Sequence, residues 1–119
     1  MILIFFPGIT KDMDHDDKKL EKLNVLLYQL GEQVKDIPTL LDYHEWKNNL
    51  DYTMQEIRDI SDKAYESLED LVTQVCRLGE EHIYELDNDE PPSVTARSSE
   101  LYFEQVAYIT SEINRLKIL

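Results

Sequence analysis

Cysteine, glycine and proline are scarce in this 119-residue chain, with one, three and four residues respectively. A single cysteine, Cys76, excludes an internal disulfide framework and favours a reducing compartment. Glycine and proline are the residues that most often interrupt helices and strands. Their scarcity therefore predicts a few long regular elements. At this length the chain is expected to form one domain with a modest core of its own.

A long hydrophobic run is also missing. The chain opens with six apolar residues, MILIFF, followed by Pro7-Gly8, whereas a helix that crosses a bilayer needs about 20 apolar residues. The opening also lacks the charged first part and the longer apolar part of a secretion signal. We therefore expect a cytoplasmic protein that makes no membrane contact.

Basic residues are outnumbered, because 12 lysines and arginines face 25 aspartates and glutamates, and the formal net charge is −13. A surplus of this size repels nucleic acid and anionic membranes and attracts basic proteins. Aromatic residues make up 9% and apolar residues 42% of the chain, which is too much for a disordered acidic tail. The composition favours a folded acidic protein whose partner is a basic protein rather than nucleic acid.

Motifs of enzymes and metal sites are missing as well. The three histidines, His15, His44 and His82, are scattered, and no two lie four residues apart as in a helical zinc site. There is no glycine-rich phosphate loop, and the E-E-x-x-E motif of the all-α pyrophosphohydrolases has only loose counterparts. His82 falls in an apolar row, which is typical of a hydrogen-bonded core histidine, and Cys76 shows no sign of activation. We therefore predict a protein without enzymatic activity, metal or cofactor.

Heptad spacing is the pattern that the chain has in abundance. Apolar residues in steps of three and four predict a helix over 12–37, which Pro38 stops. A longer row, with apolar residues every seven positions, predicts one helix over 40–86. Gly79 is its expected bend, and a break near Asn48-Asn49 is an alternative. The first row is Leu20, Leu23, Leu27, Leu30, Val34 and Ile37, and the second is Tyr43, Leu50, Ile57, Ala64, Leu71 and Leu78.

The last part of the chain divides into a linker and a helix. Residues 87–98, DNDEPPSVTARS, contain Pro91-Pro92, which disfavours a helix, so we predict a linker there. Ser98 or Ser99 would then cap a last helix over 99–119. The apolar row of this helix is Tyr102, Val106, Ile109, Ile113 and Leu116.

Together these elements predict an all-α fold: an elongated antiparallel three-helix bundle with coiled-coil character, preceded by an apolar arm over 1–9. Short connections favour antiparallel neighbours, so the first helix would lie along the first half of the long helix and the last helix along its second half. The first helix would then start close to residues 62–66. The apolar residues of the arm would there cap the core or pair with a second copy or a partner. These residues are Ile2, Ile4, Phe5 and Phe6.

The acidic residues concentrate in the long helix and at the start of the linker. Residues 42–90 hold fifteen acidic and four basic residues, a net charge of −11. On the face opposite the apolar row, carboxylates recur in steps that rise roughly 4.5 to 6 Å along a helix, near the spacing of successive phosphates on a nucleic-acid strand. Tyr52, on the outer side of the same helix, is the expected aromatic anchor. The carboxylate row is Asp59, Asp62, Glu66, Glu69 and Asp70, and a second cluster contains Glu80, Glu81 and Glu85.

Two functions fit these features. The first is a non-enzymatic acidic protein that inhibits a basic nucleic-acid-binding protein or nuclease by presenting carboxylates in place of phosphates. DNA mimics, anti-restriction and anti-CRISPR proteins, immunity proteins and antitoxins share its small size, acidity and lack of catalytic motifs, which is a likeness of class alone. The second is a structural or adapter coiled coil that mediates assembly, a homodimer included. In that case the charged face keeps a long exposed helix in solution.

Overall fold

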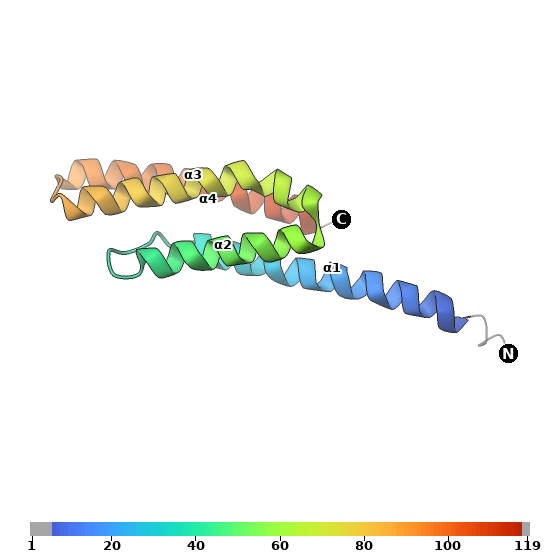
Figure 1. Ribbon diagram of the computed structural model, residues 1–119. Helices are drawn as coiled ribbons and strands as arrows, with labels where there is room; N and C mark the ends of the chain where they lie inside the picture. Colours follow the sequence, from blue (N-terminus) through green and yellow to red (C-terminus); the bar gives the residue numbers. More distant parts are fainter. Residues whose placement is uncertain (1–5, 118–119) are drawn as a thin grey trace.

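The computed structural model describes residues 6–117, and places their side chains from Asp17 onward. Within this range the chain forms four helices and no strand: α1 (Phe6–Val34), α2 (Tyr43–Ile60), α3 (Asp62–Asp87) and α4 (Pro92–Lys117) (Figure 1). The prediction of an all-α bundle is confirmed. The predicted count of three helices is wrong, because the long helix expected in the middle of the chain is two helices.

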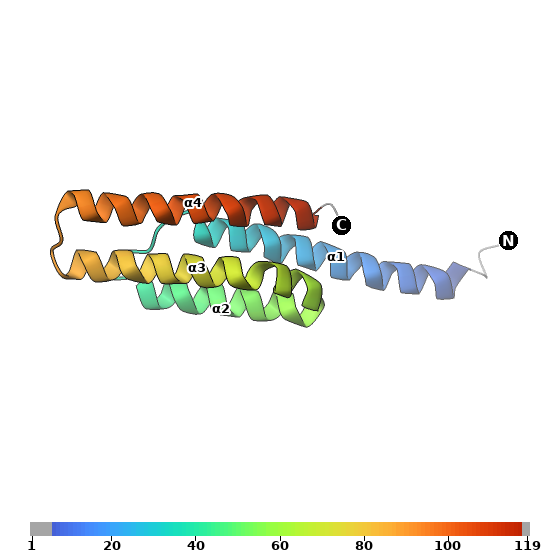
Figure 2. The same ribbon diagram turned by 90° about the horizontal axis from the view of Figure 1, so that it is seen from above.

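The four helices pack as an elongated antiparallel bundle that measures 73 × 23 × 18 Å (Figure 2). Consecutive helices run in opposite directions, and α1 and α3 each pack against both α2 and α4. The helices α1 and α3 therefore lie on one diagonal of the bundle, and α2 and α4 lie on the other. The first turns of α1 extend beyond the end of the bundle where α2 meets α3 (Figures 1 and 2).

Ser61 divides the helix that was expected over 40–86. This residue has an extended conformation (φ −149°, ψ 106°), and its side-chain oxygen accepts a hydrogen bond from the N–H of Ala64 at 3.1 Å. It therefore acts as the N-cap of α3 directly after the end of α2. Arg58 in the last turn of α2 and Asp62 in the first turn of α3 suit the dipoles of the two helix ends.

Gly79 does not bend α3, which continues through it, and α2 likewise continues through Asn48-Asn49. The glycine instead permits a close approach. A Cβ atom at position 79 would lie 3.0 Å from Cη2 of Trp46 and 3.2 Å from Cγ of Pro38. Without a side chain here, the indole ring and the connection before α2 can pack directly on α3.

The linker predicted over 87–98 is much shorter in the structure. The helix α4 begins at Pro92, because proline is favoured at the first helical position, where its missing N–H would have no partner anyway. In the connection before it, Asp89 has a left-handed conformation with φ 52°, which aspartate tolerates. Ser98 and Ser99, which were expected to cap the helix, lie inside it.

Side chains of α2 and α4 complete the end of α1, which lies before the end expected at residue 37. The indole N–H of Trp46 donates to the carbonyl oxygen of Gln33 at 3.0 Å, and the hydroxyl of Tyr102 donates to the carbonyl oxygen of Val34 at 2.7 Å. Carbonyls in the last turn of a helix have no partner within the helix. The two aromatic side chains therefore supply a cap that the local sequence of α1 lacks.

The start of α1 does not lie beside residues 62–66, as the three-helix prediction required. Instead, the stretch 19–24 inside α1 borders Ser61 and Ala64, and the helix continues beyond this point (Figure 2). Residues 1–5 lie outside the described residues, and for Phe6 only the backbone is described. The role predicted for the apolar residues of the arm therefore remains a prediction.

All four helices contribute to one apolar core along the bundle axis, and the predicted apolar rows supply most of its residues. Burying one large apolar side chain contributes about 1.5 to 3 kcal/mol, so this core is the main source of stability. Leu20 is the clearest departure from its row, since 45% of it is exposed. The buried apolar residues are Leu26, Leu27, Leu30, Val34, Leu50, Met54, Ile57, Ala64, Leu68, Val72, Val75, Leu78, Tyr102, Ile109, Ile113 and Leu116.

Candidate acidic interaction surface

The acidic residues gather on one side of the bundle. The helix α2 has four acidic and two basic residues, and α3 has eight acidic and two basic residues. The helix α1 has six acidic and four basic residues, and α4 has three of each. Because α2 and α3 are neighbours, their side carries a net charge of −8, whereas α1 and α4 together carry −2. The charge is therefore uneven around the long axis.

Most of the predicted residues lie on the solvent side of α3. We call Asp62, Glu66, Glu69, Asp70, Glu80 and Glu81 the acidic face, and all six are exposed. From its first to its last turn the face extends for about 28 Å, at 1.5 Å per residue. The opposite side of α3 is buried in the core, so these carboxylates point away from the bundle.

Asp59 does not belong to the acidic face. It lies in the last turn of α2, before the break at Ser61, and its carboxylate accepts a hydrogen bond from the amide of Gln55 at 3.5 Å. The predicted row of five carboxylates along one helix is therefore not continuous. The other four residues of the row remain on α3, and the comparison with phosphate spacing applies to that helix alone.

Arg58 and Tyr65 connect the two acidic helices. The guanidinium carbon of Arg58 lies 5.2 Å from the centre of the Tyr65 ring, a distance at which a cation is attracted to the ring face. The hydroxyl of Tyr65 donates to the carboxylate of Glu69 at 3.1 Å, and this hydrogen bond is the main reason that the pKa of Tyr65 is raised. Local sequence patterns give no signal for Tyr65, because its contact with α2 exists only when the chain turns back at Ser61.

Two other carboxylates of the acidic face, Glu80 and Glu81, interact with polar side chains nearby. Burial, followed by the charge and hydrogen bond of Glu80, raises the pKa of Tyr43 in α2 to about 12. Glu81 pairs with Arg77 at 3.4 Å along α3. Both members of this pair are largely exposed, and such a pair contributes little to stability.

Five of the six carboxylates of the acidic face belong to no ion pair with a described residue. Glu81 is the exception, through its pair with Arg77. Carboxylates in steps of three or four on a helix repel one another by a few tenths of a kcal/mol per pair. These charges therefore cost the folded protein some stability, and a bound cationic group would relieve that cost.

Glu85, which was predicted in the second cluster, lies toward α4 instead. It is half-buried, and its Oε1 atom is buried without a hydrogen-bond partner among the described residues. It borders a pocket that Arg97 and Ser98 also line. One turn earlier, His82 is buried with its Nδ1 atom 2.8 Å from the hydroxyl of Ser98, which confirms the predicted core histidine.

Tyr52 lies on α2 and is 73% exposed. The predicted exposure of this aromatic ring is therefore confirmed. It stands outside the acidic face, which belongs to α3, and its role as an anchor for a partner remains a prediction.

Among the described side chains, no group of three or more histidine, cysteine, aspartate or glutamate residues could hold a metal ion. Burial raises the pKa of the Cys76 thiol to about 11, the opposite of what a nucleophilic cysteine requires. Within residues 6–117, no helix has the length and apolar character needed to cross a membrane.

Comparison with known proteins identifies no relative, since the chain matches no protein-family model, no curated protein and no solved structure. Function is therefore inferred from the charge and geometry of the bundle.

Proposed function

We propose that the protein is a non-enzymatic acidic binding protein that occupies the basic surface of a nucleic-acid-binding protein or nuclease. The observation that carries this proposal is the uneven charge of the bundle, with −8 on the side of α2 and α3 against balanced charge on α4. A basic groove that binds phosphates attracts such a surface for the same electrostatic reason. Occupying the groove excludes nucleic acid, so the proposed activity is inhibition.

The acidic face is suited to this role because its helix is held in place. Core residues such as Leu68 and Val75 fix one side of α3, and the Arg58–Tyr65 contact joins it to α2. Charges held on a rigid helix lose little freedom on binding, which favours affinity. Long-range attraction between opposite charges also speeds association and makes it sensitive to salt.

Charge reversal tests which side of the bundle binds. The test variant is Asp62→Lys with Glu66→Lys on α3, and the matched control is Glu100→Lys with Glu104→Lys on α4. All four residues are exposed, and both pairs change the net charge equally. We expect the test variant to bind a basic partner more than about tenfold more weakly and the control to bind almost normally, because close charge pairs dominate such interfaces.

The partner is first captured on the immobilised protein from an extract of the source cells and identified by mass spectrometry. Its affinity for the wild type and both variants is then measured by calorimetry, and its binding to duplex DNA is measured with and without the protein. Circular dichroism confirms that both variants are folded. Equal weakening by both pairs would mean that net charge matters and the acidic face does not. A partner that still binds DNA while it is bound to the protein would refute inhibition.

A structural or adapter role is the second candidate, and one feature favours it: an apolar opening at one end of the bundle. Sedimentation velocity distinguishes the two functions. Capture of a basic protein by a monomer or small oligomer supports the inhibitor, whereas large assemblies that bind no basic protein support the structural role.

A further inference from the structure

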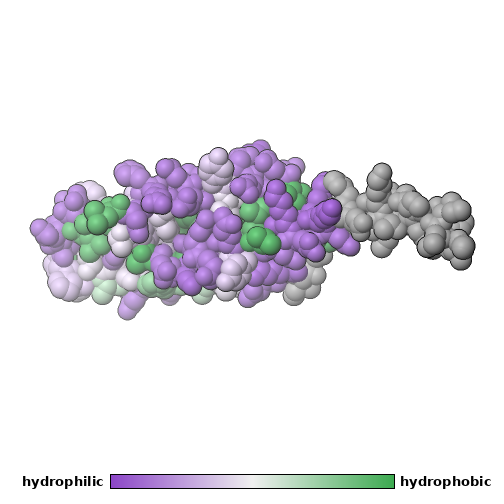
Figure 3. Space-filling model, turned by 90° about the horizontal axis from the view of Figure 1, so that it is seen from below, coloured by the Kyte–Doolittle hydropathy of each residue, from purple (hydrophilic) through white to green (hydrophobic). Residues whose placement is uncertain are grey.

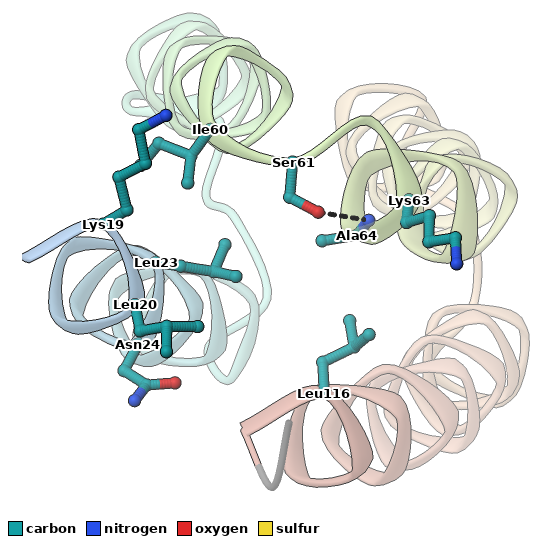
Figure 4. Close-up of a pocket in the computed structure, with 9 residues that line it drawn as sticks. All are labelled: Lys19, Leu20, Leu23, Asn24, Ile60, Ser61, Lys63, Ala64 and Leu116. Carbon is teal, nitrogen blue, oxygen red and sulfur yellow. Dashed lines mark hydrogen bonds between the residues drawn. The ribbon is translucent and has the colours of Figure 1, made fainter. Parts of the chain in front are cut away.

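The end of the bundle where α2 meets α3 has an apolar opening, which we call the mouth. It has a volume of about 470 Å³, and Leu20 and Leu23 of α1, Ile60 of α2, Ala64 of α3 and Leu116 of α4 line its apolar part (Figure 4). Leu23, Ala64 and Leu116 point into the space between the helices, and Ser61 lies beside it (Figure 4).

The helix α1 passes the mouth and continues alone. Its neighbours α2 and α4 end at Ile60 and Lys117, close to the mouth, whereas α1 extends from Leu20 back to Phe6 (Figure 2). At 1.5 Å per residue this projecting part is about 21 Å long. In the sequence, Met13 and Phe6 stand seven and fourteen positions before Leu20 and so occupy the same register row. Beyond the mouth, no helix among residues 6–117 packs against this row, which inside the bundle lies against α2 and α4.

The segment 1–5, MILIF, is apolar, but its backbone is too short to reach the mouth of its own chain while α1 is helical from Phe6. It precedes Phe6 at the far end of the projecting part of α1, about 21 Å from Leu20. Five residues in the most extended conformation reach at most about 18 Å. A second copy has no such restriction, because its segment 1–5 can arrive from the opposite direction.

We propose that two copies of the chain dimerise end to end, with their projecting α1 helices antiparallel and with segment 1–5 of each copy in the mouth of the other. In this arrangement the two projecting helices overlap along their full length, and Phe6 of one copy lies near Leu20 of the other. Segment 1–5 of each copy therefore starts at the mouth of the other. A two-fold axis through the middle of the helix pair makes both contacts identical, as in most homodimers. This inference goes beyond the proposed inhibitor function and does not depend on it.

The charge and hydropathy of the surface bear on this mode of association. In the proposed dimer the aspartates of residues 6–17 lie opposite those of the other copy and repel them, so the dimer depends on the apolar contact of segment 1–5 with the mouth. The long face shown in Figure 3 is mostly hydrophilic, with small separate hydrophobic patches, so it offers no comparable apolar surface for side-by-side pairing.

Sedimentation velocity over a range of concentrations tests the dimer with two matched variants of α1. Leu20 is 45% exposed at the mouth, and Val25 is 62% exposed on the same helix outside the residues that line it. We expect Leu20→Lys to weaken dimerisation at least tenfold, Val25→Lys to leave it unchanged, and deletion of residues 1–5 to abolish it. A wild-type chain that stays monomeric, or equal effects of the two substitutions, would overturn the proposal.

Two further measurements identify the occupant of the mouth. Deletion of residues 118–119, which follow Lys117 close to the mouth, is expected to leave the dimer intact, and loss of the dimer would contradict a contact made by segment 1–5 alone. In a Cys76→Ala background, one chain carries Ile4→Cys and another carries Lys63→Cys. Oxidation of their mixture is expected to cross-link the two chains, whereas a control mixture with Glu100→Cys in place of Lys63→Cys stays uncross-linked. Equal cross-linking in both mixtures would contradict the arrangement.

Discussion

The hydroxyl of Tyr102 in α4 donates a hydrogen bond of 2.7 Å to the carbonyl oxygen of Val34, a residue 68 positions earlier at the end of α1. The ring of Tyr102 is fully buried, and burial is also the main reason that the pKa of its hydroxyl is raised. One side chain thus fills the core and satisfies the backbone at the end of another helix. It also connects the first and last helices of the bundle.

Removing this hydroxyl should destabilise the protein. We expect Tyr102→Phe to lower the free energy of unfolding by about 1 to 3 kcal/mol, because the carbonyl of Val34 would remain buried without its donor. Urea unfolding followed by circular dichroism measures the change. Tyr108→Phe is the control, since Tyr108 is 63% exposed on the same helix and should show almost no effect. Equal effects of the two substitutions would contradict a specific role for the Tyr102 hydroxyl.

Two of the helical glycines, Gly31 and Gly79, should respond oppositely to alanine. Alanine is favoured over glycine in a helix by about 1 kcal/mol, and at Gly31 the new Cβ would meet Cδ1 of Ile113 at an ordinary 3.7 Å. At Gly79 it would meet Cη2 of Trp46 at 3.0 Å, so the ring must shift. We expect Gly31→Ala to stabilise the protein and Gly79→Ala to destabilise it in thermal unfolding. A similar gain at both positions would show that Gly79 is not needed for packing.

The buried hydrogen bond between His82 and Ser98 should stabilise the bundle as a pair. The Ser98 hydroxyl donates to the carbonyl of Thr95 at 3.0 Å, so the Nδ1–H of His82 donates to the Ser98 oxygen at 2.8 Å. Ser98→Ala leaves a buried donor without a partner and should cost about 1 to 3 kcal/mol. Replacing both residues, by His82→Leu with Ser98→Ala, should recover part of that loss in denaturant unfolding. An exposed serine of the same helix gives the control Ser111→Ala, and a loss as large as that of Ser98→Ala would refute the prediction.

The Cys76 thiol should react slowly in the folded protein. Its pKa is raised by burial from the ordinary value of 9.0 to about 11, and the thiolate is the reactive form. Labelling with a thiol reagent at pH 8 should therefore be on the order of a hundredfold slower in the folded protein than in denaturant. Equal rates in both states would show that the thiol is not protected.

The same raised pKa predicts how stability changes with pH. Between pH 9 and pH 11 the folded protein keeps a proton on Cys76 that the unfolded chain loses, so the contribution of this group is complete below pH 9 and is lost as the pH rises toward 11. The free energy of unfolding should therefore fall less for Cys76→Ala than for the wild type between pH 9 and pH 11. If the free energies of unfolding of the two proteins changed equally with pH, burial of Cys76 would not be the cause of the effect.

Much of the fold follows from the apolar rows, but the break in the middle does not. Heptad spacing places Leu50, Ile57 and Ala64 in one row and continues through Ser61 without interruption, so periodicity alone predicts one helix. The break depends on the capping hydrogen bond from Ala64 and on the packing of α2 against α3, which is a long-range effect. One residue indicates from the sequence that another element packs on the outer side of this row, because Cys76 is apolar and lies there. In the structure that element is α2, whose Lys47 is close enough to influence the pKa of the thiol.

The acidic residues were predicted by composition, and their arrangement was only partly predictable. Glu66 and Asp70 lie exposed on α3 as expected, because both the apolar row and the charged side belong to a single helix. Asp59 falls off the acidic face and Glu85 turns toward α4, because their positions depend on the turn at Ser61 and on the neighbour of α3. Local patterns cannot specify which helix will lie beside another.

The order of contacts in the bundle has a consequence for how the chain folds. The main helix contacts join neighbours in sequence, apart from the contact between α1 and α4 that includes Tyr102 and Val34. Contacts between sequence neighbours close short loops and form fast, whereas the contact of α1 with α4 must wait for a much longer loop to close. We therefore expect the three pairs of sequence neighbours to form first and the α1–α4 contact to close last. In hydrogen exchange under native conditions, α1 and α4 should then separate before the pairs of sequence neighbours open.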